Sequence, residues 1–210
     1  GNSLSYHNVH ALCMDGDDLW IGTYTGGVNV LNTKTGVFRV YTTKAGDPTT
    51  LDRSSSYAIF KDREARIWVT SMSGVNLYNR EEDNFTRIRD LGSWIMDIDQ
   101  DADGNIWFSS QGNGLFKYDP DKQEWTNYVH SSAPGALIND QVNCVLIDGN
   151  GEMWIGTMNG LCKYNAKEDQ FELIPLDIPS RNICAIIEDQ RVLWLTTTKG
   201  LVRYVPGESC

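Results

Sequence analysis

Short apolar runs recur along the whole chain, and clusters of turn residues separate them. One such run is Val142-Asn143-Cys144-Val145-Leu146-Ile147, which Asp148-Gly149-Asn150-Gly151 follows directly. Apolar runs of about four to eight residues bounded by Gly, Asn and Asp are typical of β-strands. Asp-Gly and Asn-Gly supply the positive φ that tight hairpin turns require. Helical periodicity is absent throughout, so the pattern predicts an all-β chain.

A tryptophan that follows an aliphatic residue opens one strand in each of five repeats. These anchors are Trp20, Trp68, Trp107, Trp154 and Trp194. An apolar run precedes each Trp, and a Gly follows it by six or seven residues. Leu or Tyr comes four residues after the Gly, and in four repeats an aromatic residue comes seven residues later. Each repeat, about 43 residues long, therefore carries four short strands, which is the pattern of a β-propeller blade.

We predict one β-propeller segment over residues 1–210, with the repeated aromatic residues in the core between blades. The predicted blades span residues 9–41, 57–89, 94–129, 142–175 and 183–210. The outer strand of the fifth blade would centre one residue beyond Cys210, so four blades are complete and the fifth lacks this strand. Residues 2–8 align with the loops 50–56 and 135–141 and do not replace it. Because closure removes exposed sheet edges, we expect a fragment of a larger propeller; the alternative is a five-bladed ring closed irregularly or by a second copy.

Charge and cysteine usage narrow the function classes. The net charge is −10 and the pI about 4.7, with no basic cluster, which excludes a nucleic-acid binder. No apolar run approaches the roughly 18 residues of a membrane span, and no basic amphipathic segment is present, so this segment is not expected to insert into a membrane.

The five cysteines (Cys13, Cys144, Cys162, Cys184 and Cys210) include no CxxC, and most are expected to be small buried residues rather than disulfide or zinc partners. We predict no cofactor and no metal site.

The fourth repeat resembles the two-component regulator propeller repeat. It reads Asp148-Gly149-Asn150-Gly151-Glu152-Met153-Trp154-Ile155-Gly156-Thr157, with Gly160-Leu161 and Tyr164 after it. Residues 101–107 and 20–23 also match well, whereas the second and fifth repeats have Val69-Thr70-Ser71 and Leu195-Thr196-Thr197 in place of Ile-Gly-Thr. The resemblance covers essentially the whole chain.

This resemblance implies a segment of a seven-bladed propeller in the periplasmic sensor region of a hybrid histidine kinase of the inner membrane. Many such sensors respond to glycan breakdown products. The segment itself is then non-catalytic. Its implied partners are the rest of the parent propeller, an oligosaccharide or other small ligand, and a second copy of the chain in a homodimer.

Irregularities in the repeat indicate where a ligand binds. The Trp-to-Trp spacings are 48, 39, 47 and 40, and the extra length falls in the inter-blade loops 42–56 and 129–141, which should rise on one face. The first strands start at the central channel on that face, with the polar and aromatic residues Asn8, Tyr57, Trp94, Gln141, Arg181 and Asn182. An aromatic platform beside amides and one Arg suits a sugar or a small acid. Alternatively, Tyr57 and Trp94 fill the channel mouth or pack under loops.

Three other interpretations remain open. A propeller lyase similar to streptogramin lyases would need a histidine-based metal site, but His7, His10 and His130 do not recur in the repeat, and we identify no catalytic residue. The string Asp99-Gln100-Asp101-Ala102-Asp103-Gly104 is similar to the start of a calcium loop, yet Ser110 stands where that loop has Glu, which favours a plain turn. The propeller could also serve only as a protein-interaction or dimerisation scaffold.

Overall fold

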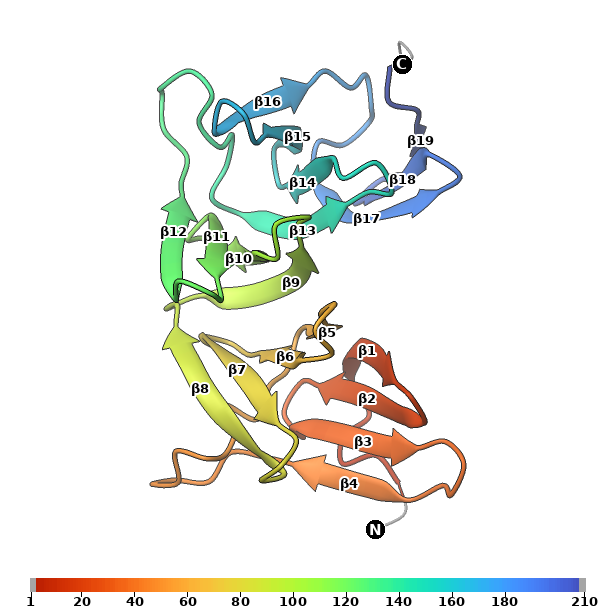
Figure 1. The fold of residues 1–210 in the computed structure, drawn as a ribbon. Helices are drawn as coiled ribbons and strands as arrows, with labels where there is room; N and C mark the ends of the chain where they lie inside the picture. The colour runs from red at the N-terminus through yellow and green to blue at the C-terminus, as the bar shows by residue number, and fades with distance from the viewer. Residues whose placement is uncertain (1–2, 208–210) are drawn as a thin grey trace. The chain divides into compact units, whose positions relative to one another are not determined.

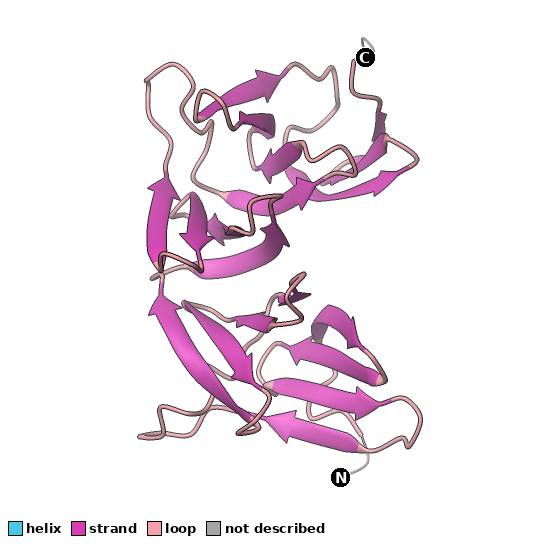
Figure 2. Ribbon diagram, in the orientation of Figure 1, coloured by secondary structure: helices cyan, strands magenta, loops and turns pink. Residues whose placement is uncertain are grey.

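A computed structural model describes residues 3–207, and the regular structure in this range is β-strand (Figure 2). The strands form four four-stranded sheets and one three-stranded sheet. Within each sheet every strand pairs antiparallel with the next along the chain, as Figure 1 shows. The all-β propeller prediction, with four complete blades and three strands of a fifth, is confirmed for the described residues. The chain divides into two compact units, the first ending at Ile95 and the second beginning at Met96, which are described separately.

The first unit contains two blades. Blade 1 consists of β1 (Val9–Asp15), β2 (Asp18–Thr23), β3 (Val28–Asn32) and β4 (Phe38–Tyr41). Blade 2 consists of β5 (Ile59–Lys61), β6 (Ile67–Thr70), β7 (Gly74–Asn79) and β8 (Asn84–Asp90).

The second unit contains three blades. Blade 3 consists of β9 (Trp94–Gln100), β10 (Ile106–Gln111), β11 (Leu115–Asp119) and β12 (Glu124–Tyr128), and the first two residues of β9 belong to the first unit. Blade 4 consists of β13 (Val142–Ile147), β14 (Met153–Thr157), β15 (Gly160–Asn165) and β16 (Gln170–Ile174). Blade 5 consists of β17 (Ile183–Asp189), β18 (Val192–Thr197) and β19 (Gly200–Tyr204). Cys210 lies outside the described residues.

Three of the repeated tryptophans, Trp20, Trp107 and Trp154, lie in cores that form between consecutive blades, whereas Trp194 of blade 5 is half-buried. Trp20, at 1% exposed, shares a cluster with Ile59 and Phe85 of blade 2. Trp107 is fully buried in the corresponding cluster with residues of blade 4. Side chains along a strand alternate between the two faces of its sheet, so the indole on the second strand lies on one face. A side chain as large as Trp on that face fills the space between its sheet and the next.

In blades 1 and 3 the repeated glycine after the second strand has a steric cause. Gly27 and Gly114 both adopt a φ of +77°. A Cβ on either residue would lie 2.0 Å from a backbone oxygen, that of Tyr41 for Gly27 and that of Tyr128 for Gly114. Only glycine combines this left-handed conformation with so close an approach of the fourth strand.

The two long inter-blade loops fold against the next blade. Leu51 in the first loop and Leu137 in the second are each 1% exposed and join the inter-blade cores. The amide of Phe85 donates to the carbonyl of Thr49 at 2.9 Å, and the amide of Phe171 donates to that of Gly135 at 2.7 Å. Each loop thus adds a backbone hydrogen bond to the outer strand of the following blade, a role that loop length alone does not indicate.

Candidate functional site

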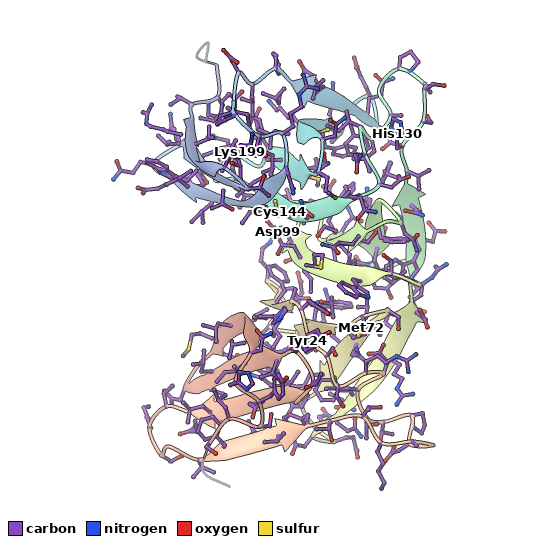
Figure 3. The ribbon with its side chains drawn as sticks, turned by 180° about the vertical axis from the view of Figure 1, so that it is seen from behind. Tyr24, Met72, Asp99, His130, Cys144 and Lys199 are labelled. Atoms are coloured by element: carbon purple, nitrogen blue, oxygen red, sulfur yellow. The ribbon has the colours of Figure 1, made fainter. Side chains whose placement is uncertain are left out.

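Four aromatic rings meet in the first unit, and we call them the aromatic cluster: His10, Tyr24, Tyr57 and Trp94. Tyr57 precedes β5 and Trp94 opens β9; their rings stack with centroids 5.6 Å apart and planes 16° apart. His10 on β1 meets the ring of Tyr57 edge to face at 5.0 Å. Tyr24, labelled in Figure 3, follows β2 and stacks on His10 at 5.8 Å. The cluster therefore draws on the first strands of blades 1 and 3, the segment just before the first strand of blade 2, and the loop after β2.

Exposure differs sharply within the aromatic cluster. Tyr57 is only 6% exposed, whereas Trp94 is 41% and Tyr24 37% exposed. Tyr57 therefore forms the floor, and the other rings present apolar surface to solvent. A single exposed aromatic ring is ordinary, but several exposed rings in one contiguous patch are typical of a binding surface.

The hydroxyl of Tyr57 is buried and has no hydrogen-bond partner among the described residues. Burial raises the pKa of Tyr57, and the neighbouring Tyr24 adds to the rise. The phenol is therefore neutral at physiological pH and keeps a proton to donate. A buried hydroxyl without a partner costs about 1–3 kcal/mol, so it is a group that a ligand acceptor could satisfy.

Backbone hydrogen bonds hold the cluster in place. The carbonyl of Asn8 accepts the amide of Tyr24 at 3.0 Å. The amide of Tyr57 donates to the carbonyl of Thr70, and the Thr70 hydroxyl donates to the carbonyl of Ile95 at 3.1 Å, beside Trp94. Of the predicted ligand residues, the structure thus brings Asn8, Tyr57 and Trp94 together, with Asn8 acting through its backbone.

The other three predicted residues, Gln141, Arg181 and Asn182, lie in the second unit. The backbone of Gln141 accepts the amide of Met158 at 3.0 Å. The side-chain oxygen of Asn182 accepts from Asn143 at 2.9 Å. Arg181 is exposed beside a groove of about 800 Å³ whose apolar walls include Leu161, Ile174, Leu176 and Tyr204. Gln141 and Asn182 thus make hydrogen bonds within the second unit, and the grouping of these three residues with the aromatic cluster stays a prediction.

Sequence reasoning missed His10 and Tyr24 as members of the site. Tyr24 lies in a second-to-third strand loop, which was expected on the same face as the starts of the first strands. His10 is one residue into β1, after Val9, which pairs with Thr23 at the end of β2. The signal available was this pairing, which brings the start of β1 beside the Tyr24 loop.

Two partly buried acids, Asp97 and Asp99 of β9, join the inner strands of blades 3 and 4. Asp97 accepts the amide of Val145 at 3.2 Å, and Asp99 accepts the amide of Ile147 at 2.6 Å. Figure 3 labels Asp99 on β9 and Cys144 on β13. Burial raises the pKa of Asp97 to about 7, although the amides of Val145 and Ile98 oppose the rise. These carboxyls satisfy strand amides that β14 does not reach.

The calcium-like string of residues 99–104 folds as a turn. The carboxylate of Asp101, at its centre, accepts hydrogen bonds from N–H groups of the protein. Asp101 accepts the indole N–H of Trp107 at 2.8 Å and the amide of Asn105 at 2.9 Å.

His130 makes a hydrogen bond with the carbonyl of Leu137 at 2.9 Å through Nδ1. Within residues 3–207, no group of three or more His, Cys, Asp and Glu side chains is placed to hold a metal ion. In the same range, no helix combines the length and apolar character of a membrane span.

Comparisons with known proteins agree with this architecture. Residues 3–25 and 136–159 match the family model described as two component regulator propeller. Over 157 residues the chain is 29% identical to a histidine kinase of Formosa agariphila, covering 70% of this chain and 11% of that protein.

Two solved structures of extracellular domains have a fold similar to that of this chain. The extracellular domain of a hybrid two-component system from B. thetaiotaomicron is 25% identical, with a TM-score of 0.82 over 97% of this chain and 28% of that chain. A second such domain from the same organism is 21% identical, has a TM-score of 0.80 and supports the fold. The chain thus spans about a quarter of these domains and about a tenth of the kinase. Two segments of the chain thus match the two-component regulator propeller model, and its fold is similar to part of the extracellular domains of hybrid two-component systems.

Proposed function

We propose that this chain is part of the extracytoplasmic ligand-sensing propeller of a hybrid two-component signalling protein, and that the aromatic cluster binds a small glycan-derived ligand. The repeat family and the similarity to an extracellular domain of a hybrid two-component system support the sensor assignment. The observation that carries the ligand assignment is the exposed ring of Trp94, stacked on buried Tyr57.

The geometry of the cluster suits a sugar ring. One face of Trp94 packs on Tyr57, and the ring is still 41% exposed, so apolar ring surface remains available. The C–H groups of a pyranose pack on such a surface, because the ring face is electron-rich and apolar. His10 and Tyr24 extend the surface sideways. The Tyr57 hydroxyl is buried beneath these rings, so it donates to a sugar oxygen only where ligand binding displaces a neighbouring ring; that bond would then fix the orientation of the ligand.

In this proposal the segment binds and does not catalyse. Phosphoryl transfer belongs to other parts of the parent protein, and the remaining propeller blades complete the sensor region. Because the chain spans only part of its relatives, the periplasmic location of the segment is part of the proposal.

A saccharide screen on the complete sensor region tests this function. Thermal shift with a panel of oligosaccharides should identify a ligand, and isothermal titration should show that Trp94→Ala lowers its affinity at least ten-fold. Val40→Ala is the matched control, since Val40 on β4 is 46% exposed, lies outside the aromatic cluster and should leave binding unchanged. Binding that survives Trp94→Ala would place the site elsewhere.

The same screen separates the proposal from the scaffold alternative. If no saccharide shifts the melting temperature, the ligand assignment is wrong. Light scattering of the sensor region would then show whether the propeller instead mediates self-association.

A further inference from the structure

One carboxylate joins tyrosines of two consecutive blades, and the arrangement occurs twice. Asp83 of blade 2 accepts the hydroxyl of Tyr41 from β4 of blade 1 and that of Tyr78 from β7, each at 2.5 Å. Asp169 of blade 4 accepts the hydroxyl of Tyr128 from β12 of blade 3 at 2.7 Å and that of Tyr164 from β15 at 2.5 Å. We call each such group a tyrosine clamp.

The two clamps have the same local geometry. Asp83 and Asp169 both have a left-handed backbone, with φ of 51° and 53°. The next aromatic residue on the outer strand meets the clamp edge to face: Phe85 lies 5.3 Å from Tyr41, and Phe171 lies 5.3 Å from Tyr128. The two clamps share residue types, backbone conformation and closely similar distances, which indicates a repeated structural device; in the first clamp Arg39 also lies 3.7 Å from Asp83.

The clamps are charged hydrogen bonds at neutral pH. Partial burial by itself would raise the pKa of Asp83, but the hydroxyls of Tyr41 and Tyr78 outweigh it and lower the pKa. The hydroxyls of Tyr164 and Tyr128 likewise lower the pKa of Asp169. Burial and the bond to Asp169 raise the pKa of Tyr164 to about 12. Neutral hydroxyls therefore donate to an ionised carboxylate, a bond stronger than one between neutral groups.

The long loops reinforce the same two blade pairs. Leu51 lies in the core that blades 1 and 2 share, and Leu137 lies in the core that blades 3 and 4 share. In the first pair, Asp15 of β1 also forms ion pairs with Lys61 at 2.8 Å and with Arg80 at 2.6 Å, both from blade 2. Each pair thus has a buried leucine, a loop-to-strand backbone bond and a clamp.

The other blade junctions lack the residue types for a clamp. At the positions that correspond to Tyr41 and Tyr128, blades 2 and 4 carry Ile88 and Ile174. At the position of Asp83, blade 3 carries Gln123, which keeps the left-handed turn with a φ of 59° but has no carboxylate. The linkers at these junctions are also the short ones. Tyr78 and Tyr164, Asp83 and Asp169, and Phe85 and Phe171 are each 86 positions apart.

We propose that the unit of cooperative local unfolding in this propeller is a pair of consecutive blades. Blades 1 and 2 form one pair and blades 3 and 4 form the other, and each pair opens and closes as one unit held by its tyrosine clamp. The sequence repeats every blade, whereas the tyrosine clamp and the buried loop leucine occur at every second junction. Blades 4 and 5 share an apolar core and hydrogen bonds but have no clamp among the described residues. Cooperative opening in contiguous units is the behaviour that amide hydrogen exchange detects.

Hydrogen exchange with mass spectrometry on the full chain tests this proposal, using Tyr41→Phe and Tyr128→Phe as reciprocal variants. Each change removes one inter-blade hydrogen bond and keeps the ring, so the fold is preserved. In the wild type, the slowest amides of β2–β3 and of β6–β7 should share one opening constant. Tyr41→Phe should accelerate exchange in both sets by the same factor, about ten-fold for a bond to a charged group, and leave β14–β15 unchanged.

Tyr128→Phe should have the reciprocal effect. It should accelerate amide exchange in β10–β11 and in β14–β15 by the same factor and leave exchange in β2–β3 unchanged. If Tyr41→Phe accelerates exchange in only one blade, the single blade is the unit. If it accelerates every blade alike, the whole chain is the unit. Either outcome overturns the proposal.

Discussion

The indole N–H of Trp154 donates a hydrogen bond of 2.9 Å to the carboxylate of Asp148. The same bond joins Trp107 to Asp101 at 2.8 Å and Trp68 to Asp62 at 2.7 Å. In each case the Asp stands six residues before the Trp, at the start of the turn between the first two strands. The acid of this turn therefore fixes the buried indole of its own blade.

Within the described residues, blade 1 lacks this hydrogen bond. We therefore expect Trp→Phe substitutions in blades 1 and 4 to lower the free energy of unfolding by different amounts. Its first turn is one residue shorter, Asp15 pairs with Lys61 and Arg80, and Trp20 Nε1 is buried without a partner among the described residues. Trp154→Phe should cost more free energy of unfolding than Trp20→Phe, by about 1.5–3 kcal/mol, because only the former breaks a bond to a charged group. Urea denaturation of both variants measures the difference, and equal costs would contradict the assigned role of Asp148.

The buried leucines of the long loops should contribute as core residues despite their place in loops. Leu51→Ala and Leu137→Ala should each lower the free energy of unfolding by about 2–5 kcal/mol, because each leaves a cavity between two blades. Denaturant unfolding of each variant measures the loss. Leu173→Ala is the control: this leucine is 51% exposed and its loss should cost less than about 0.5 kcal/mol. A long-loop variant that behaves like this control would show that the loop does not belong to the core.

Asp97 should make stability fall as the pH rises toward neutrality. Burial raises its folded-state pKa to about 7, whereas the unfolded chain has the ordinary Asp pKa near 3.9. Between these values the unfolded chain releases a proton that the folded protein retains, so the contribution is fully present below about pH 4 and is lost by about pH 7.

Unfolding measured from pH 4 to 8 checks this, and Asp97→Asn should flatten the dependence across that window. The groups that face Asp97 are the amides of Val145 and Ile98, together with Asp99 and Cys144. Asp83→Asn is the comparison, because Asp83 has a lowered pKa and its contribution is instead lost as the pH falls below about 4. A profile that Asp97→Asn leaves unchanged would show that Asp97 is ionised in the folded protein at pH 5–6.

The blades could be predicted from sequence because their signals are local. Trp154, its turn and Tyr164 follow one another at fixed spacing, so one repeat specifies one sheet. The clamps could not be predicted in this way, because Tyr41 and Asp83 are 42 positions apart and each is also an ordinary strand or turn residue. The aromatic cluster was predicted in part: Tyr57 and Trp94 depart from the aliphatic pattern of the other repeats, whereas the place of His10 beside the Tyr24 loop follows only from the pairing between β1 and β2. Ligand binding by the cluster stays a prediction.

The buried hydroxyl of Tyr57 allows the ligand site to be tested without removing an aromatic ring. This hydroxyl has no partner among the described residues, so Tyr57→Phe should leave the free energy of unfolding unchanged or raise it by about 1 kcal/mol. If a ligand oxygen accepts from the hydroxyl, the same variant should weaken saccharide binding by about three- to ten-fold, as expected for one neutral hydrogen bond. Titration calorimetry and thermal melting of the same preparation measure both effects. A variant that is destabilised and binds normally would assign the hydroxyl to the fold, whereas a stable variant with weakened binding would place it in the ligand site.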